Sequence, residues 1–300
     1  MNPLIRPKAL KVGDKVGLIS TSSSVEYLED IEKAVANIKK LGLDPVLGKY
    51  AEESNEYLAG TDEQRAEDFN HMFADLSIKG IICMRGGYGS IRMLDKINWD
   101  MLKKNPKIFV GYSDVTALHT AINKRAGFIT YHGPMATIEL LDKDLDDLTL
   151  TSLKDNIFGK VDNLNLNNYP VKTLVPGFFS GKLVGGNLAT IVSTLGTVYD
   201  IETDGNVLFL EDIKEPRYKI DRMMTHISLA GKLDKIAGVI VGHITDEKGN
   251  MVETLDIIKN ILEPLGVPCL YNLPCGHKLP NITLPLGSIV GWNKIDEEIL

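Results

Sequence analysis

The first half of the sequence alternates between short apolar runs and longer segments in which apolar residues recur at helical spacing. Short apolar runs are typical of buried strands, and the longer segments are typical of amphipathic helices. The expected strands are 15–21, 78–84, 107–110 and 128–131, and the expected helices are 27–41, a segment that opens at Thr61 or Asp62, and 113–125. Alternation of this kind predicts an α/β fold built on a parallel sheet with helices on both faces.

The second half of the sequence has a different pattern, which predicts a second domain. From about 140 to 180 the chain is largely polar, and a Pro-Gly pair at 176–177 is typical of a connector. Beyond it, strands are expected over 206–210, 236–241 and 269–272, and helices over 218–230 and 254–265. A chain of 300 residues is long enough for two cores. We predict an N-terminal α/β domain over 1–165, a linker over 166–178 and a smaller mixed α/β domain over 179–300.

Charge and composition exclude several classes of partner. The formal net charge is −7 and no basic cluster occurs, which argues against nucleic acid or an anionic membrane as the main partner. No apolar run reaches the roughly 18 residues of a transmembrane helix, and the first residues lack the apolar core of a signal peptide. The three cysteines are too sparse for a disulfide framework, which is typical of a reducing compartment. We therefore expect a soluble cytoplasmic protein that acts on a small molecule.

The stretch KIFVGYSDVTALH, residues 107–119, places Ser113 between an expected strand and an expected helix. In parallel α/β sheets, ligands bind beyond the carboxyl ends of the strands, where the unpaired N–H groups of a helix's first turn also lie. Ser113 therefore stands where a nucleophile would. Serine and aspartate are also favoured N-caps, and on this stretch alone a cap at Ser113 or Asp114 is the simpler interpretation. The G-x-S-x-G motif of hydrolases is not met, because position 115 is Val.

A glycine-rich stretch, RGGYGS at residues 85–90, follows another expected strand. Glycines let a backbone approach a ligand closely. A dinucleotide-binding loop would need a third glycine where Arg92 stands, and the Gly-Lys-Ser/Thr of a phosphate-binding loop is absent. The loop can instead present N–H groups to a developing oxyanion, or it can be only a tight turn between a strand and a helix.

Two further stretches supply a candidate acid and a candidate base. In LFLEDIKEPRYKIDRM, residues 208–223, an apolar strand leads to Glu211 and Asp212, and acidic residues at the end of a buried strand need partners. Glu211 can orient a histidine, or it can act as a cap or pair with a nearby lysine or arginine. His277 follows a short expected strand in a Gly- and Pro-rich loop and is a candidate general base. Ser113, Glu211 and His277 occur in the nucleophile–acid–base order of the α/β-hydrolases.

The remaining histidines and the cysteines are weaker candidates. His132 and His243 end expected strands and can line a site. Cys269, Cys275 and His277 lack a fourth ligand at a recognisable spacing. We therefore expect no metal site, and no inhibition by EDTA.

The stretches GYSDVTALH, RGGYGS, LFLEDIKEPRYKIDRM and GHKLPNITLPLG closely resemble, in this order, motifs of the LD-carboxypeptidase family of serine peptidases. YLAGTDEQRAEDF at 57–69 and YHGPM at 131–135 are also similar to that family. The resemblance covers nearly the whole chain. It implies a class I glutamine amidotransferase-like α/β domain followed by a smaller, swivelling-type β/α domain.

The resemblance also implies roles for individual residues. Ser113 matches the family's nucleophile, His277 its general base, and Glu211 the carboxylate that orients the base. A Ser-His-Glu triad of this kind needs no metal or organic cofactor. The family's members are often dimers, so the resemblance implies a homodimer.

Residues that bind the oxyanion and the substrate are less sharply defined by the resemblance. The backbone N–H of Asp114 is implied as one oxyanion donor, and that of Gly86 or Gly87 as the other. An exopeptidase must also recognise a free carboxylate. Arg85 or a loop amide is a candidate for that contact, and Tyr88 is a further candidate for substrate binding.

The family divides by substrate. It includes murein tetrapeptide carboxypeptidases, which release a terminal D-alanine, and microcin C self-immunity peptidases, which cut an amide in a peptidyl nucleotide. The short run from Glu211 to His277 looks more like the murein type. The nucleotide-peptide branch is the alternative, and a non-catalytic α/β module that binds an anion is an alternative of another class.

Overall fold

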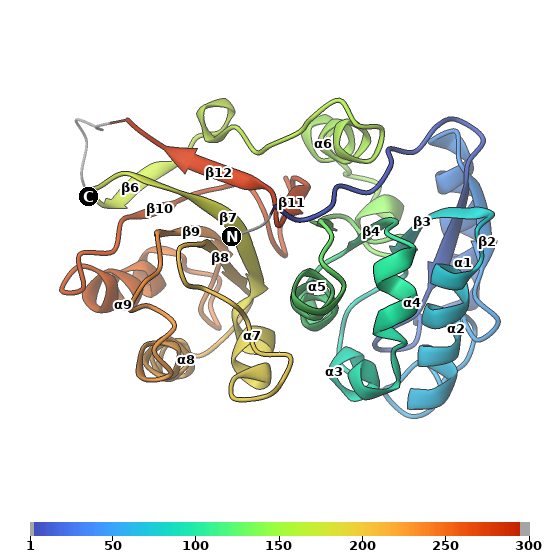
Figure 1. The fold of residues 1–300 in the computed structure, drawn as a ribbon, viewed down its shortest axis with the longest axis horizontal. Helices are drawn as coiled ribbons and strands as arrows, with labels where there is room; N and C mark the ends of the chain where they lie inside the picture. The colour runs from blue at the N-terminus through green and yellow to red at the C-terminus, as the bar shows by residue number, and fades with distance from the viewer. Residues whose placement is uncertain (1–2, 295–300) are drawn as a thin grey trace.

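The computed structural model describes residues 3–294, so the outer ends of the two predicted domains, 1–2 and 295–300, lie outside the described residues. Within that range the chain forms two six-stranded sheets, which lie side by side along the long axis of the molecule (Figure 1). None of the helices in this range is long and apolar enough to cross a membrane.

The first sheet has the strand order β11-β5-β4-β3-β1-β2. Five of its strands are parallel, and β11 pairs antiparallel with β5. Their bounds are β1 Lys15–Ile19, β2 Asp44–Leu47, β3 Ile78–Cys83, β4 Ile108–Gly111, β5 Thr130–His132 and β11 Leu284–Leu286. The helices that accompany this sheet are α1 Leu28–Lys40, α2 Asp62–Ala74, α3 Ser90–Met93, α4 Trp99–Lys104, α5 Thr116–Ala121 and α6 Asp147–Ile157.

Helices cover both faces of the first sheet, as the alternating pattern predicts. On one face Phe69 and Phe73 of α2 pack with Phe109 of β4 and with α5. On the other face α1 and α6 pack against β1 through Ile38 and Leu153, among others. Thr61 caps α2 in a full capping box with Gln64, which confirms the predicted start of that helix.

The second sheet has the order β12-β7-β8-β9-β10-β6, with a parallel centre and antiparallel edge strands. Its strands are β6 Lys172–Val175, β7 Phe179–Asn187, β8 Val207–Asp212, β9 Gly238–Ile244, β10 Cys269–Tyr271 and β12 Ile289–Trp292. Helices α7 Leu188–Thr194, α8 Arg217–Leu229 and α9 Val252–Leu262 pack on one face of it. The mixed α/β character of this half is therefore confirmed.

Several elements differ from the sequence-based expectation. The expected helix over 113–125 is three successive helical pieces, a 3-10 turn Ser113–Val115, α5, and a π-helical segment Ile122–Ala126. Short 3-10 turns also occur at Leu94–Lys96, Glu139–Leu141 and Leu166–Asn168. The nine-residue strand β7 was not expected, because its glycines interrupt the apolar pattern. Gly186 lies there because a Cβ would come within 2.5 Å of Thr116 Oγ1.

The chain passes between the two sheets more than once. β6 lies within the stretch 166–178 that is predicted as a linker, yet it adds an edge strand to the second sheet. β11, in the C-terminal part of the chain, pairs with β5 of the first sheet, between the two halves in Figure 1. This return places the loop before β11, which carries His277, beside the first domain.

Candidate active site

Ser113 stands at a sharp turn directly after β4. Its backbone has φ +62°, a left-handed conformation that is costly for a residue with a side chain. The turn that follows β4 spans Ser113–Val115 and its N-cap residue is Tyr112. Ser113 and Asp114 both lie inside the turn, so the interpretation of either as its N-cap is wrong. Backbone strain such as that at Ser113 is typical of functional positions.

The glycine-rich loop after β3 lies against this turn. A Cβ added at Gly86 would come within 2.9 Å of Ser113 Cβ and 3.1 Å of Ser113 Oγ. A Cβ added at Gly87 would instead collide with Ser23. Within residues 3–294, the N–H groups of Gly86, Gly87 and Asp114 donate to no backbone acceptor, which leaves all three for an oxyanion.

Asp114 fixes the turn in place through its side chain. The buried carboxylate accepts a hydrogen bond from Ser22 Oγ at 2.7 Å and from Ser90 N at 2.8 Å. Ser22 belongs to the loop after β1, and Ser90 begins α3 after the glycine-rich loop. Three loops at the carboxyl end of the sheet are thereby joined. The serine run after β1 was missed in the sequence, although it too follows a buried strand.

His277 and Glu211 form a hydrogen-bonded pair. His277 Nδ1 lies 2.7 Å from Glu211 Oε2, and the glutamate is fully buried at the end of β8. Burial is the largest single influence and lowers the pKa of His277. The charge of Glu211, the hydrogen bond to it and the charges of Asp212 and Glu139 together outweigh burial, so the pKa lies above its ordinary value. Because Nδ1 faces the carboxylate, Nε2 is the nitrogen that can take up a proton. A Cβ at Gly276 would come within 3.0 Å of Glu211 Oε2, so the glycine lets the pair form.

His277 packs against the ring of Tyr112, the residue before Ser113. The Tyr112 and His277 rings are edge to face, with 4.9 Å between their centroids, and Tyr112 immediately precedes Ser113. Within residues 3–294, Ser113 Oγ makes no hydrogen bond, to His277 or to any other group. Catalytic hydrogen bonds are often long or unformed without substrate. The structure therefore places the His277–Glu211 pair against Tyr112, the residue that precedes Ser113, and the Ser113–His277 contact stays a prediction.

A buried hydrogen-bond network connects the loop of His277 to Tyr112, at the Ser113 turn. Tyr112 Oη donates to Glu139 Oε1 at 2.5 Å, and Asn281 Nδ2 donates to the same oxygen at 3.2 Å. Asn281 Oδ1 in turn accepts from Gly276 N at 3.0 Å. Burial raises the pKa of Glu139. Neither Glu139 nor Asn281 was a candidate from the sequence, because no local pattern marks a residue whose partners are so distant in the chain.

Comparison with known proteins agrees with this geometry. The family model for the LD-carboxypeptidase N-terminal domain matches residues 16–133, and that for the LD-carboxypeptidase C-terminal domain matches residues 180–291. The chain belongs to the LD-carboxypeptidase family. Membership makes it a hydrolase of a serine carboxypeptidase family, and it confirms the resemblance that the sequence motifs carry.

Similar proteins come from both branches of the family. The chain is 37% identical to a probable murein peptide carboxypeptidase of Bacillus subtilis, over 97% of this chain and 92% of that protein. A solved structure of the microcin C7 self-immunity protein MccF with glutamyl sulfamoyl guanosine superposes with a TM-score of 0.86 at 27% identity, covering 96% and 95% of the two chains. A muramoyltetrapeptide carboxypeptidase of Oxalobacter formigenes superposes with a TM-score of 0.80 at 26% identity, covering 92% and 94%. This LD-carboxypeptidase therefore has the two-domain α/β fold of those structures.

The two candidate substrate-binding residues of the glycine-rich loop lie at the edge of the site. Arg85 Nη1 donates to Ser24 O at 3.1 Å, so this guanidinium braces the loop after β1. Tyr88 is about half exposed, its N–H donates to Ser23 Oγ at 3.2 Å, and its ring lies 6.0 Å from that of Tyr57. These contacts hold Arg85 against the loop after β1 and leave the ring of Tyr88 partly at the surface, and a role of either residue in substrate binding stays a prediction.

The other histidines differ in their access to the site. His243 lines a cavity of about 240 Å³ together with His277, as its place at a strand end suggested. His132 is fully buried between the rings of Tyr112 and Phe209, and burial holds its pKa well below the usual range. Within residues 3–294, no group of three or more His, Cys, Asp or Glu side chains is arranged to hold a metal ion.

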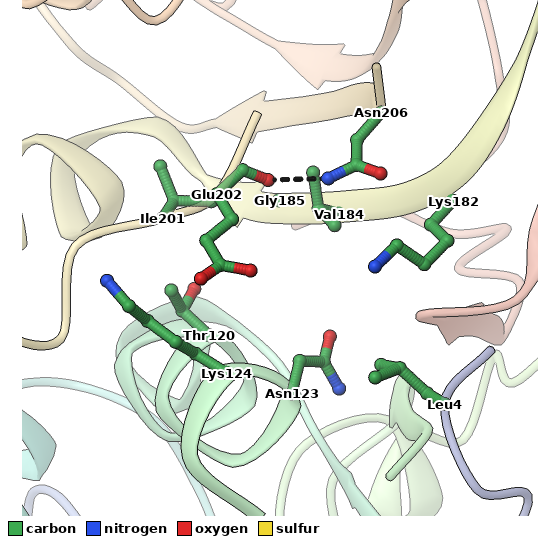
Figure 2. A pocket seen from close by; sticks show the side chains of 10 residues that line it. All are labelled: Leu4, Thr120, Asn123, Lys124, Lys182, Val184, Gly185, Ile201, Glu202 and Asn206. Carbon is green, nitrogen blue, oxygen red and sulfur yellow. Dashed lines mark hydrogen bonds between the residues drawn. The ribbon is translucent and has the colours of Figure 1, made fainter. Parts of the chain in front are cut away.

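Figure 2 shows a second cavity, which residues of both halves of the chain line. Ser113, Glu211 and His277 are not among its lining residues. Thr120 of α5 and Lys124 line one side of it, and Lys182 of β7 lines another. Its volume of about 40 Å³ is close to the share of a single water molecule. It is too small for a peptide.

Gly86→Ala is expected to lower kcat at least about 100-fold, because the new methyl group would displace Ser113 and the oxyanion donors beside it. Steady-state kinetics on a murein tetrapeptide would measure the loss. Gly291→Ala in β12, an edge strand of the second sheet, is the control, because its Cβ would meet no atom closer than 3.3 Å, whereas the Cβ at Gly86 would lie 2.9 Å from Ser113 Cβ. Equal activity in the two variants would show that Gly86 does not adjoin the reacting group.

Tyr112→Phe is expected to destabilise the fold by about 1–3 kcal/mol, because it leaves a buried acceptor, Glu139, without one donor. Looser positioning of the His277 loop should also lower kcat. The matched control is Tyr50→Phe, which removes an exposed hydroxyl bond to Glu67 and should change little. Urea unfolding of both variants would measure the difference. A Tyr112 variant as stable as the control would contradict the network's role.

Proposed function

We propose that this LD-carboxypeptidase releases the terminal D-alanine of murein tetrapeptides, through an acyl-enzyme formed on Ser113. The observation that carries the proposal is the 2.7 Å bond from His277 Nδ1 to Glu211, beside a serine held at φ +62°. A base oriented by a carboxylate, next to an activated serine, is the arrangement that serine peptidases use on unrelated folds.

In the first half of the reaction, His277 Nε2 takes the proton of Ser113 Oγ as this oxygen attacks the carbonyl of the scissile bond. The carbonyl oxygen becomes an oxyanion, which the N–H groups of Asp114 and of Gly86 or Gly87 can stabilise. We favour Gly86, because its backbone adjoins Ser113 Oγ whereas Gly87 faces Ser23. Glu211 holds the imidazole in the tautomer with hydrogen on Nδ1 and stabilises its charged form.

In the second half, His277 gives its proton to the nitrogen of the leaving D-alanine, and the carbon–nitrogen bond breaks. A water molecule, deprotonated by His277, then attacks the ester on Ser113. The acid product leaves and the serine recovers its proton. Each step uses the same three side chains, so no further acid or base is needed.

Two observations favour a murein peptide as the substrate. The B. subtilis relative at 37% identity is named a probable murein peptide carboxypeptidase, and the O. formigenes structure is a muramoyltetrapeptide carboxypeptidase. We infer a role in peptidoglycan recycling in the cytoplasm. The similarity to MccF makes a peptidyl nucleotide the second candidate substrate.

The test is a substrate panel with the purified wild-type protein. D-alanine release from a murein tetrapeptide, with no release from the epimer that ends in L-alanine, would establish both the class and the bond. Cleavage of a glutamyl sulfamoyl nucleoside but not the tetrapeptide would move the protein to the nucleotide-peptide branch. Hydrolysis of neither would favour a non-catalytic, anion-binding role.

We also propose a homodimer. The measurement is the molar mass of the full chain by light scattering during gel filtration. A mass near twice 33.1 kDa supports the dimer, and a mass near 33.1 kDa contradicts it.

A further inference from the structure

A cavity of about 240 Å³ opens beside His277, in the C-terminal half of the site. Its lining comes from the end of β8 and the loop after it (Asp212, Ile213 and Lys214), from the end of β9 and the residues beyond it (His243, Thr245 and Gly249), and from His277 and Lys278. Pockets for drug-sized ligands have about 300–1,000 Å³. The cavity is therefore of a size for one residue of a substrate rather than for a whole peptide.

Of the charged side chains that line this cavity, the two lysines are available to bind an anion. Asp212 is occupied, because its carboxylate accepts hydrogen bonds from Asn187 Nδ2 at 3.1 Å, Ala189 N at 3.0 Å and Ile213 N at 2.9 Å. His243 is neutral at pH 7, because burial and the charge of Lys278 lower its pKa to about 4. Lys214 and Lys278 are exposed, and neither forms an ion pair with another side chain of the described part of the chain. Two lysines against the one carboxylate of Asp212 leave the lining with a net positive charge, in a protein of net charge −7.

The backbone conformation of Lys214 indicates that its side chain has a function. Its φ is +55°, a conformation in which glycine would be more stable than lysine. The loop is held in this shape by bonds from Lys214 N to Thr245 Oγ1 and from Glu215 N to Thr245 O, each 3.1 Å long. The chain therefore carries a long cationic side chain at a position where the backbone disfavours any side chain.

We propose that this cavity binds a carboxylate of the substrate between Lys214 and Lys278. This rests on the proposed function for its orientation. His277 protonates the leaving nitrogen, so the leaving residue lies on the His277 side of the scissile bond, and its carboxylate is one carbon away from that nitrogen. The carboxylate of the leaving D-alanine is therefore the ligand that the geometry favours. In this proposal Lys214 and Lys278, rather than Arg85, contact the carboxylate. Arg85 donates a hydrogen bond to Ser24 O.

The test compares two tetrapeptide substrates that differ only at the C-terminus, one with a free carboxylate and one with a carboxamide. For the free acid, Lys214→Met and Lys278→Met should each raise KM about tenfold or more with little change in kcat. For the carboxamide, which wild type should cleave poorly, neither substitution should change kcat/KM. Lys235→Met, which alters an exposed lysine paired with Asp204, is the control. Lysine variants that keep the full wild-type preference for the free acid would overturn the proposal.

A second pair of substrates distinguishes the two sources of a carboxylate. The third residue of the peptide is diaminopimelate, with a side-chain carboxylate, or lysine, without one. If the lysine variants lose activity only on the diaminopimelate peptides, whatever the C-terminus, the cavity binds that side chain. Loss on the free-acid peptides with either third residue assigns the cavity to the leaving D-alanine.

A binding measurement separates failure of this proposal from failure of the proposed function. N-acetyl-D-alanine and N-acetyl-D-alaninamide are titrated into the wild type and the two lysine variants by NMR. Even if the wild type hydrolyses no tetrapeptide, weaker binding of the acid alone to the variants supports a carboxylate site. No binding of the acid to the wild type, or equal binding to all three proteins, overturns it.

Discussion

Replacing Ser113 by alanine is expected to lower kcat for D-alanine release by about 10⁴- to 10⁶-fold, with the fold retained. The reason is that the oxyanion donors and the binding contacts remain, while the covalent step is lost. Release of D-alanine under single-turnover conditions, with excess enzyme, is the measurement. Ser193→Ala, at an exposed serine whose hydroxyl bonds only to Thr190 O, is the control and should match wild type. Near-wild-type hydrolysis by a folded Ser113→Ala protein would eliminate Ser113 as the nucleophile.

The same position carries a prediction on stability that does not depend on the substrate. At φ +62° a Cβ is unfavourable and glycine is not. Ser113→Gly should therefore be more stable than Ser113→Ala by about 1 kcal/mol, although both are inactive. Urea unfolding of the two variants measures the difference. If alanine proved the more stable residue, the turn would not hold the left-handed conformation in solution.

Replacing Glu211 by glutamine is expected to lower kcat by about 10³- to 10⁴-fold, the second largest effect. The reason is that His277 loses the acceptor that fixes its tautomer and stabilises its positive charge. The control is Glu202→Gln, an exposed carboxylate beside the cavity of Figure 2, which should leave kcat unchanged. Activity in Glu211→Gln equal to that of the control would show that the 2.7 Å bond has no part in catalysis.

The pH dependence of kcat/KM in wild type and in Glu211→Gln tests the role of Glu211 independently. A general base must be neutral before it accepts a proton, so activity falls as the pH drops through the pKa of His277. In wild type Glu211 raises this pKa, so the acid limb of kcat/KM should lie above the ordinary value of 6.5. In Glu211→Gln the charge of Glu211 is lost, and burial, the largest cause, lowers the pKa against only the smaller raising effects of Asp212 and Glu139, so the limb should move to lower pH. A limb that stays in place would mean that another group titrates there.

The local pattern of apolar residues was sufficient to predict most of the central strands and helices. The apolar runs at β1, β3, β4, β8, β9 and β10 and the amphipathic segments at α1, α2, α8 and α9 follow directly from residue spacing. The pattern did not reveal β7, because its glycines lie where neighbouring atoms exclude a Cβ, and the neighbours are distant in the sequence. Nor did it show that β6 completes the second sheet, because edge strands carry a weak apolar signal.

For the site, the sequence by itself determined which residue types are present and that Ser113, Glu211 and His277 each follow an expected strand. Those are local properties, set by the spacing of apolar residues and glycines along the chain. Only the tertiary structure decided that Ser113 is no cap, that Gly86 rather than Gly87 adjoins it, and that Arg85 braces a loop.

The tertiary structure also joined the two halves of the site. His277 Nδ1 contacts Glu211 within the second half, while the Tyr112 ring and the Glu139–Asn281 bond connect that pair to the Ser113 turn of the first half. The physical reason is that β11 returns to the first sheet and carries the preceding loop with it. Contacts between residues more than a hundred positions apart depend on how the sheets pack, which no short stretch of sequence encodes.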